Sequence, residues 1–176
     1  MDDRQIHRRQ FLIGLSASMG AALTPMAAKA AQAAISNEQM TSPLLLSTEQ
    51  LEAVKIISDI IIPDTDTPGA AKAGVHHFIN KVVSYALDDK ERADFLTGLT
   101  KAKTILGLSL QEQTELVRQW DNNRLNDEFF NGLKQSVIFG YYTSKIGATQ
   151  ELRFDPVPGP YKEIPFKDVG RAWALR

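Results

Sequence analysis

Cysteine is absent from the 176 residues of this sequence. Its absence excludes disulfide bonds, a lipobox anchor, iron–sulfur ligation by thiolates and covalent haem attachment through a C-x-x-C-H motif. The folded domain must therefore be stabilised by its apolar core.

The sequence also lacks the short motifs of the common cofactor and nucleotide sites, such as G-x-G-x-x-G after a strand, a P-loop or a G-x-S-x-G elbow. The adjacent His76 and His77 would point about 100° apart on a helix, so they could not chelate one metal together. Asp64 and Asp66 do not begin a calcium loop, because its twelfth position is Val75 instead of glutamate. Aspartates beside Thr and Pro are typical of side-chain-to-backbone turn bonds. We expect no catalytic residue, no cofactor-binding residue and no metal ligand in this chain.

The first 30 residues have the pattern of an export signal. A basic segment containing Arg8 and Arg9 precedes an uncharged run over 11–23, which is too short to span a bilayer. Arg8-Arg9-Gln10-Phe11-Leu12 resembles the R-R-x-F-L core of twin-arginine signals, which direct folded cargo across the membrane. The alternative is an ordinary secretory signal that happens to hold two arginines. We expect localisation in the periplasm, after export in the folded state.

Ala28 and Ala30 form the expected A-x-A cleavage site of this signal. Residues 1–30 hold four of the 20 basic and two of the 21 acidic residues, so the remaining chain has 16 basic and 19 acidic side chains. No block of five basic residues occurs after cleavage, so nucleic acid is not an expected partner. No later segment is long and apolar enough to cross a membrane, and we expect membrane association only through partners.

The chain after the signal is predicted to be mainly α: a small domain of about five helices over 47–146, preceded by a linker over 31–46. Ser47 with Gln50 and Ser109 with Glu112 are capping boxes that predict two helix starts. Pro63 ends the first helix, and Thr67 followed by Pro68 predicts the start of the second. The remaining helices are expected over about 90–106 and from Asp127 to Ser144.

The last segment, 147–176, is predicted to be an extended tail. Prolines and glycines exclude a helix of ordinary length there. Yet aromatic residues recur through it, which flexible linkers lack. We therefore expect an ordered tail that packs on its own domain or on a partner. The aromatic residues are Phe154, Tyr161, Phe166 and Trp173.

Two separated stretches of this chain have the character of family signatures. The first is D-I-I-I-P-D-T-D-T-P-G-A over 59–70, followed by A-G-V over 73–75. The second comprises D-P-V-P-G over 155–159, Tyr161 and G-R-A-W over 170–173, with Tyr142 and Gly147 before it. Together they resemble the signatures of the gluconate 2-dehydrogenase subunit 3 family. One departure is Glu163-Ile164, where many members carry a Gly-Cys pair, so any role of that cysteine is not expected here.

The resemblance implies a non-catalytic small, or gamma, subunit of an oxidoreductase complex that acts on CH–OH groups of sugars, polyols or gluconate. In such complexes an FAD-dependent large subunit of the glucose-methanol-choline type does the chemistry, and a multihaem cytochrome c often accepts the electrons. The small subunit is expected to carry the large one through the twin-arginine translocase and to aid its maturation as a chaperone. FAD would therefore belong to the partner. A stand-alone periplasmic sugar-binding or cofactor-binding protein is the alternative.

The two signature stretches supply the candidates for partner contact. The alternatives are that the first only ends one helix and starts another, and that the second only covers its own core. The candidate residues are Pro63, Asp64, Thr65, Asp66, Pro68, Gly69, Pro156, Pro158, Gly159, Tyr161, Arg171 and Trp173.

Overall fold

The computed structural model describes residues 45–123, 127–155, 163, 165–168 and 170–174. Within these ranges the protein is mainly α-helical and contains no β-strand, as predicted. The helices are α3 (Thr48–Ile61), α4 (Val75–Tyr85), α5 (Asp89–Ala102), α6 (Leu110–Asn122) and α7 (Glu128–Thr143). Short helical segments follow α5 (η1, Lys103–Gly107) and α7 (η2, Gly147–Glu151), and η3 (Phe166–Asp168) lies near the C-terminus.

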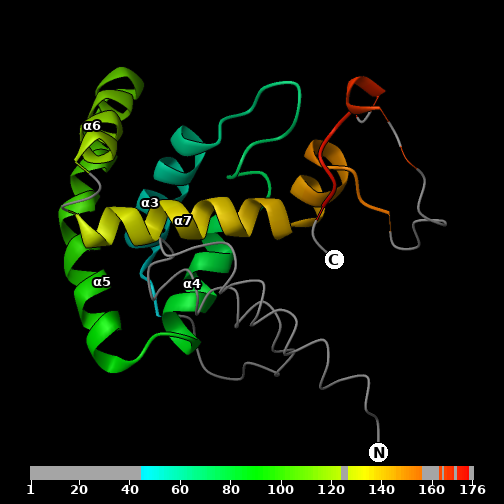
Figure 1. Ribbon diagram of the computed structural model, residues 1–176. Helices are drawn as coiled ribbons and strands as arrows, with labels where there is room; N and C mark the ends of the chain where they lie inside the picture. The colour runs from blue at the N-terminus through cyan, green and yellow to red at the C-terminus, as the bar shows by residue number, and fades with distance from the viewer. Residues whose placement is uncertain (1–44, 124–126, 156–162, 164, 169, 175–176) are drawn as a thin grey trace, which may run out of the picture.

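The long helix α7 organises the domain, because it packs against α3, α4, α5 and α6. Figure 1 shows α7 lying across the other helices, with η2 and the C-terminal residues at the end opposite to α5 and α6. Buried apolar side chains from all these helices form one core, to which each fully buried Leu, Ile or Val contributes roughly 1.5–3 kcal/mol. The largest fully buried side chains are Tyr141, Phe130, Ile57, Ile79, Leu99, Ile105 and Leu133.

Both predicted capping boxes are confirmed. The Ser47 hydroxyl accepts a hydrogen bond from the Gln50 amide (3.3 Å), and the Gln50 side chain accepts one from the Ser47 amide (2.9 Å). The same reciprocal pair joins Ser109 and Glu112 at the start of α6. Each box satisfies donors that the first turn of a helix would otherwise leave without partners.

The predicted start of the second helix is wrong. The helix α4 begins at Val75 instead of at Pro68, and Gly74 precedes it with a φ of 73°, a left-handed conformation that favours glycine. Thr67 does not cap α4, because its hydroxyl is bound to Glu151. The backbone of 62–74 closes on itself instead: the Ala70 amide bonds to Ile62 O (2.9 Å) and the Val75 amide to Ala70 O (3.1 Å).

The predicted tail is helical at its beginning, which corrects the expectation of an extended segment from residue 147 onward. Residues Gly147–Glu151 form a wide π-helical turn. Gly147 permits this turn because a Cβ at that position would collide with the backbone carbonyl of Tyr141. After Leu152 the described residues include an isolated parallel bridge between Arg153 and Trp173 and a second short helical segment, η3.

Several sequence predictions fall outside the described residues. These are the signal and its cleavage site over 1–30 and most of the linker over 31–46, of which the structure describes Leu45 and Leu46. Leu46 is buried in the core, and its amide donates to the side-chain oxygen of the buried Asn80 (3.2 Å). Across the described ranges, every helix is too short or too polar to cross a bilayer.

Candidate functional site

The first signature stretch forms a tight loop between α3 and α4. The Asp64 carboxylate accepts a hydrogen bond from the Gly69 amide (2.6 Å), and the Thr65 amide donates to Thr67 O (3.0 Å). The second carboxylate oxygen of Asp64 forms an ion pair with Lys72. The hydrogen bond from the Gly69 amide, and then that from Lys72, hold the pKa of Asp64 below its usual value. Asp64 thus makes the side-chain-to-backbone turn bond predicted from the sequence.

This loop is bound to the C-terminal side of the molecule through two hydroxyl groups. The buried Tyr141 of α7 donates its hydroxyl hydrogen bond to Pro68 O (2.9 Å). Thr67 donates to the carboxylate of Glu151 in η2 (2.7 Å). Figure 1 shows the loop between α3 and α4 extending toward η2. The loop is therefore held at both α7 and η2.

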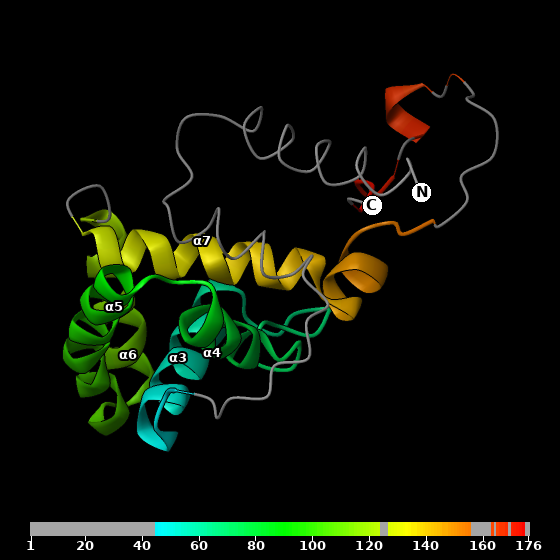
Figure 2. The ribbon, with the colours of Figure 1, turned by 90° about the horizontal axis from the view of Figure 1, so that it is seen from below.

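The second signature stretch returns to the same η2 segment. The backbone of Arg153 bonds on both sides to the chain near Trp173: its amide donates to Ala172 O (2.8 Å), and its carbonyl accepts from the Ala174 amide (2.9 Å). The Arg153 guanidinium lies 4.3 Å from the centroid of the Trp173 ring, and Arg171 donates to Gln150 O. Figure 2 shows this C-terminal segment beside the end of η2. Residues of both signature stretches, which lie far apart in the sequence, therefore contact the chain around residues 150–153.

The predicted interface residues fall into three groups. Pro63, Asp64, Thr65 and Asp66 are exposed on the loop, whereas Pro68 is partly buried and Gly69 is buried. Arg171 and Trp173 are exposed in the C-terminal segment. The export residues Arg8, Arg9, Phe11, Leu12, Ala28 and Ala30 and the tail residues Pro156, Pro158, Gly159 and Tyr161 lie outside the described part of the chain.

Sequence reasoning missed the residues that join the two stretches: Gln150, Glu151, Arg153 and the hydroxyl of Tyr141. No spacing pattern links Glu151 to Thr67, because the two lie 84 positions apart. The alternation of Arg171 and Trp173 along an extended segment is the one signal that could have indicated a shared face.

The hydroxyl of Tyr141 provides a test of this arrangement. Tyr141→Phe removes the hydrogen bond to Pro68 O without changing the packing of the ring, and we expect a loss of about 1–2 kcal/mol in the free energy of unfolding. The neighbouring Tyr142→Phe is the control, because Tyr142 is exposed and should lose almost nothing. Urea denaturation of both variants measures the difference. If Tyr141→Phe and Tyr142→Phe both left the free energy of unfolding almost unchanged, the hydrogen bond to Pro68 O would not stabilise the loop as described.

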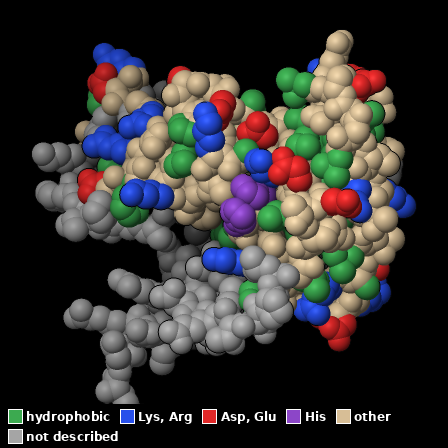
Figure 3. All heavy atoms as spheres, turned by 180° about the vertical axis from the view of Figure 1, so that it is seen from behind, with side chains coloured by type: hydrophobic (Ala, Val, Ile, Leu, Met, Phe, Trp, Pro, Cys, Tyr) green, Lys and Arg blue, Asp and Glu red, His purple; other side chains and the backbone are tan. Residues whose placement is uncertain are grey.

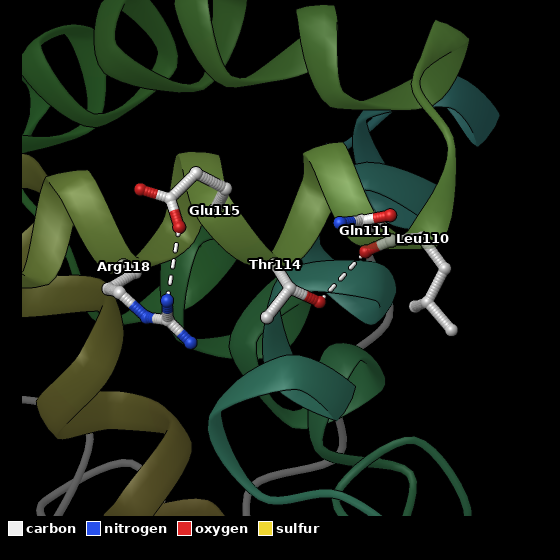
Figure 4. A pocket seen from close by; sticks show the side chains of 5 residues that line it. All are labelled: Leu110, Gln111, Thr114, Glu115 and Arg118. Atoms are coloured by element: carbon white, nitrogen blue, oxygen red, sulfur yellow. Dashed lines mark hydrogen bonds and ion pairs between the residues drawn. The ribbon is translucent and has the colours of Figure 1, made fainter.

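A shallow hollow of about 560 Å³ lies on the outer face of α6. Figure 4 shows two contacts among the residues that line it: Arg118 pairs with Glu115 (3.1 Å), and Thr114 donates to Leu110 O (2.8 Å). Among the described residues, no three His, Asp or Glu side chains lie where they could hold a metal ion together. Arg118, Glu115 and Thr114 are thus engaged in contacts along the surface of α6.

His76 and His77 are close neighbours at the start of α4, with ring centroids 4.1 Å apart. Figure 3 shows the pair with basic and acidic side chains nearby. His76 is buried and its Nδ1 has no hydrogen-bond partner within the described residues. Burial lowers the pKa of His76, and His77 and Lys55 lower it further, whereas Glu52 opposes them. His76 is thus held in its neutral form.

This environment predicts that acid destabilises the fold. The native state binds a proton at His76 more weakly than the unfolded chain does, so stability should fall as the pH drops below 6.5, the ordinary pKa of histidine. We expect the urea midpoint to decrease between about pH 8 and pH 5, and His76→Gln to flatten this dependence. His77→Gln should flatten the dependence less than His76→Gln does, because His77 only adds to the effect of burial on the pKa of His76. A profile as steep in His76→Gln as in the wild type would contradict the assignment.

Comparison with known proteins gives one match. A family model described as gluconate 2-dehydrogenase subunit 3 matches residues 48–159, more than half of the chain. The matched range contains α3 to α7, the loop with Asp64 and Gly69, and the joining residues of η2. No curated protein and no solved structure matches the chain significantly.

Proposed function

Because the chain belongs to the gluconate 2-dehydrogenase subunit 3 family, we propose that it is the non-catalytic small subunit of a periplasmic, FAD-dependent sugar, polyol or gluconate dehydrogenase. Its role is to carry the catalytic large subunit across the membrane by the twin-arginine route and to aid its maturation. The observation that carries this proposal is the family match, because the family is defined by one subunit of a multisubunit dehydrogenase. Electron transfer to a multihaem cytochrome c belongs to the same proposal.

The polar contacts of the first signature stretch with itself and with η2 support a binding role. Asp64 closes its own loop and Glu151 accepts from Thr67, so both carboxylates are engaged in holding backbone segments together. Near these contacts Phe154 and Trp173 are 47% and 43% exposed. Large exposed aromatic side chains gathered at one end of a domain are typical of protein–protein contact sites.

The proposal assigns the chemistry to another polypeptide. The large subunit would bind FAD and the substrate, and this chain would hold it in an export-competent complex. The signal at Arg8 and Arg9 would then serve two chains, only one of which carries it.

Purification of the tagged full-length chain from the cells that produce it tests this function. We expect a larger polypeptide to co-purify and the sample to show the absorption of a flavin, with dehydrogenase activity toward a sugar, polyol or gluconate. After the partner is dissociated, this chain should be colourless. A flavin that stays with the isolated chain would support the cofactor-binding alternative. Thermal stabilisation of the isolated chain by a sugar would support the sugar-binding alternative.

A further inference from the structure

One exposed face at the C-terminal end combines two arginines with a tryptophan. We call it the arginine–tryptophan face, and it consists of Arg153, Arg171 and Trp173. The backbone of Arg153 holds the chain at Ala172 and Ala174 through two hydrogen bonds of 2.8 and 2.9 Å. Its guanidinium lies 4.3 Å from the centroid of the Trp173 ring, and Trp173 is 43% exposed. The face is therefore a built arrangement and not a chance grouping of surface side chains.

Within the described part of the chain, Arg153 and Arg171 differ from most other basic side chains in having no carboxylate partner. Seven basic side chains in the described ranges form ion pairs with Asp or Glu: Lys55, Lys72, Lys90, Arg92, Lys103, Arg118 and Lys134. Arg153 and Arg171 form none with any described residue, and neither the exposed Glu163 nor the exposed Asp168 pairs with them. Arg171 contacts a neutral carbonyl, that of Gln150, and Arg153 contacts an aromatic ring.

This pattern indicates what the face can bind. A guanidinium carries five N–H donors in a planar fork that fits a carboxylate through two parallel hydrogen bonds. A guanidinium stacked on an aromatic ring is already ordered, so it loses little side-chain entropy on binding. Arginine and tryptophan are also enriched among the residues that dominate binding energies at protein interfaces. Two such arginines around one indole are complementary to a segment that presents carboxylates beside an apolar side chain.

We propose that the arginine–tryptophan face is the anchor that binds an acidic segment of the large subunit. This inference rests on the proposed function for the identity of the partner, and it adds the place and the chemistry of the contact. The partner segment would place Asp or Glu side chains against Arg153 and Arg171 and an apolar group against Trp173.

The loop of the first signature stretch is connected to the arginine–tryptophan face through η2. Thr67 holds Glu151, and the adjacent Gln150 accepts from Arg171, so the loop and the face are joined through one turn of η2. Displacement of the loop would therefore shift η2 and with it both arginines. Both signature stretches would then contribute to the same binding face: the second provides Arg171 and Trp173, and the first holds η2 in place.

Charge reversal with a matched control tests the proposal. The double variant Arg153→Glu, Arg171→Glu is produced as the tagged full-length chain together with the large subunit, and the retained flavoprotein is measured over a series of salt concentrations. We expect a roughly tenfold or greater loss of retained large subunit at low salt, because like charges would face each other. The control is Arg118→Glu, an exposed arginine on α6 at the other end of the domain, which should retain as much as the wild type. Wild-type retention should itself decrease as the salt concentration rises.

A second double variant, with neutral instead of reversed charges, tests the proposal if charge reversal disturbs folding. Arg153→Gln, Arg171→Gln removes both charges and adds none, and circular dichroism with thermal melting establishes that it is folded. This variant should also retain less large subunit than the wild type does. Folded variants that retain the flavoprotein as well as the wild type at every salt concentration would overturn this inference alone. Absence of any large subunit from the wild-type sample would overturn the proposed function and this inference with it.

Discussion

Replacement of both Arg8 and Arg9 by lysine is expected to abolish the appearance of this chain in the periplasm. Lysine preserves the positive charge of the segment but loses the planar guanidinium, so recognition that depends on the arginine pair fails. An ordinary secretory signal needs only a positive segment before its apolar run, and it would still function with lysines. The variant therefore separates the twin-arginine prediction from its alternative. Cell fractionation with an antibody against the chain measures the result.

The control for this variant is Arg4→Lys, which changes a basic residue outside the pair. It should leave export at the wild-type level. If the Arg8→Lys, Arg9→Lys chain reaches the periplasm as efficiently as Arg4→Lys does, the signal is of the ordinary kind and the protein is not exported by the twin-arginine route.

Gly69→Ala is expected to be among the most damaging single substitutions in the folded domain. A Cβ on Gly69 would lie 2.6 Å from Ile62 O, 2.7 Å from Asp64 N and 2.7 Å from Pro63 C. All three are backbone atoms of the same loop, so no side chain can rotate away to make room. We expect a loss at or above the upper end of the roughly 1–3 kcal/mol that overpacking costs, together with loss of the hydrogen bond from Gly69 to Asp64.

A second glycine serves as the control for this prediction. Beyond its chain neighbours, a Cβ on Gly107 would meet no atom of the described residues within 4 Å, and Gly107 does not adopt a left-handed conformation. Gly107→Ala should therefore leave the free energy of unfolding within about 1 kcal/mol of the wild type. Urea denaturation of the two variants gives the comparison. Similar midpoints for Gly69→Ala and Gly107→Ala would show that the loop is not packed as described.

The helices could be predicted from local patterns because local contacts determine their ends. Ser47 and Ser109 each bond to the residue three positions further along the chain, and Asp127 accepts from the Phe130 amide in the same way. The starts of these three helices therefore depend on residues that are close in sequence. The start of α4 was wrong because distant residues decide it. Thr67 and Pro68 look like a helix start, but their hydroxyl and carbonyl groups are bound by Glu151 and Tyr141, which are remote in sequence.

The candidate site was predicted in part for the same reason. The sequence marks each signature stretch separately by its proline, glycine and aspartate residues, but it contains no local sign that the two meet. Their junction at η2 depends on the wide turn at Gly147 and on pairs such as Arg153 and Trp173, which only the fold brings together. The sequence also could not indicate that Arg153 and Arg171 lack an ion-pair partner among the described residues. That property depends on which basic and acidic side chains the fold brings together.

The location of the large subunit's flavin in the cell tests the central claim most directly. Three strains are compared: one without this chain, one with the full chain, and one in which residues 1–30 precede an unrelated folded domain. We predict flavin-bearing large subunit in the periplasm only with the full chain, because export needs the signal and the helical domain that holds the partner. Periplasmic large subunit in the strain without this chain would contradict the account.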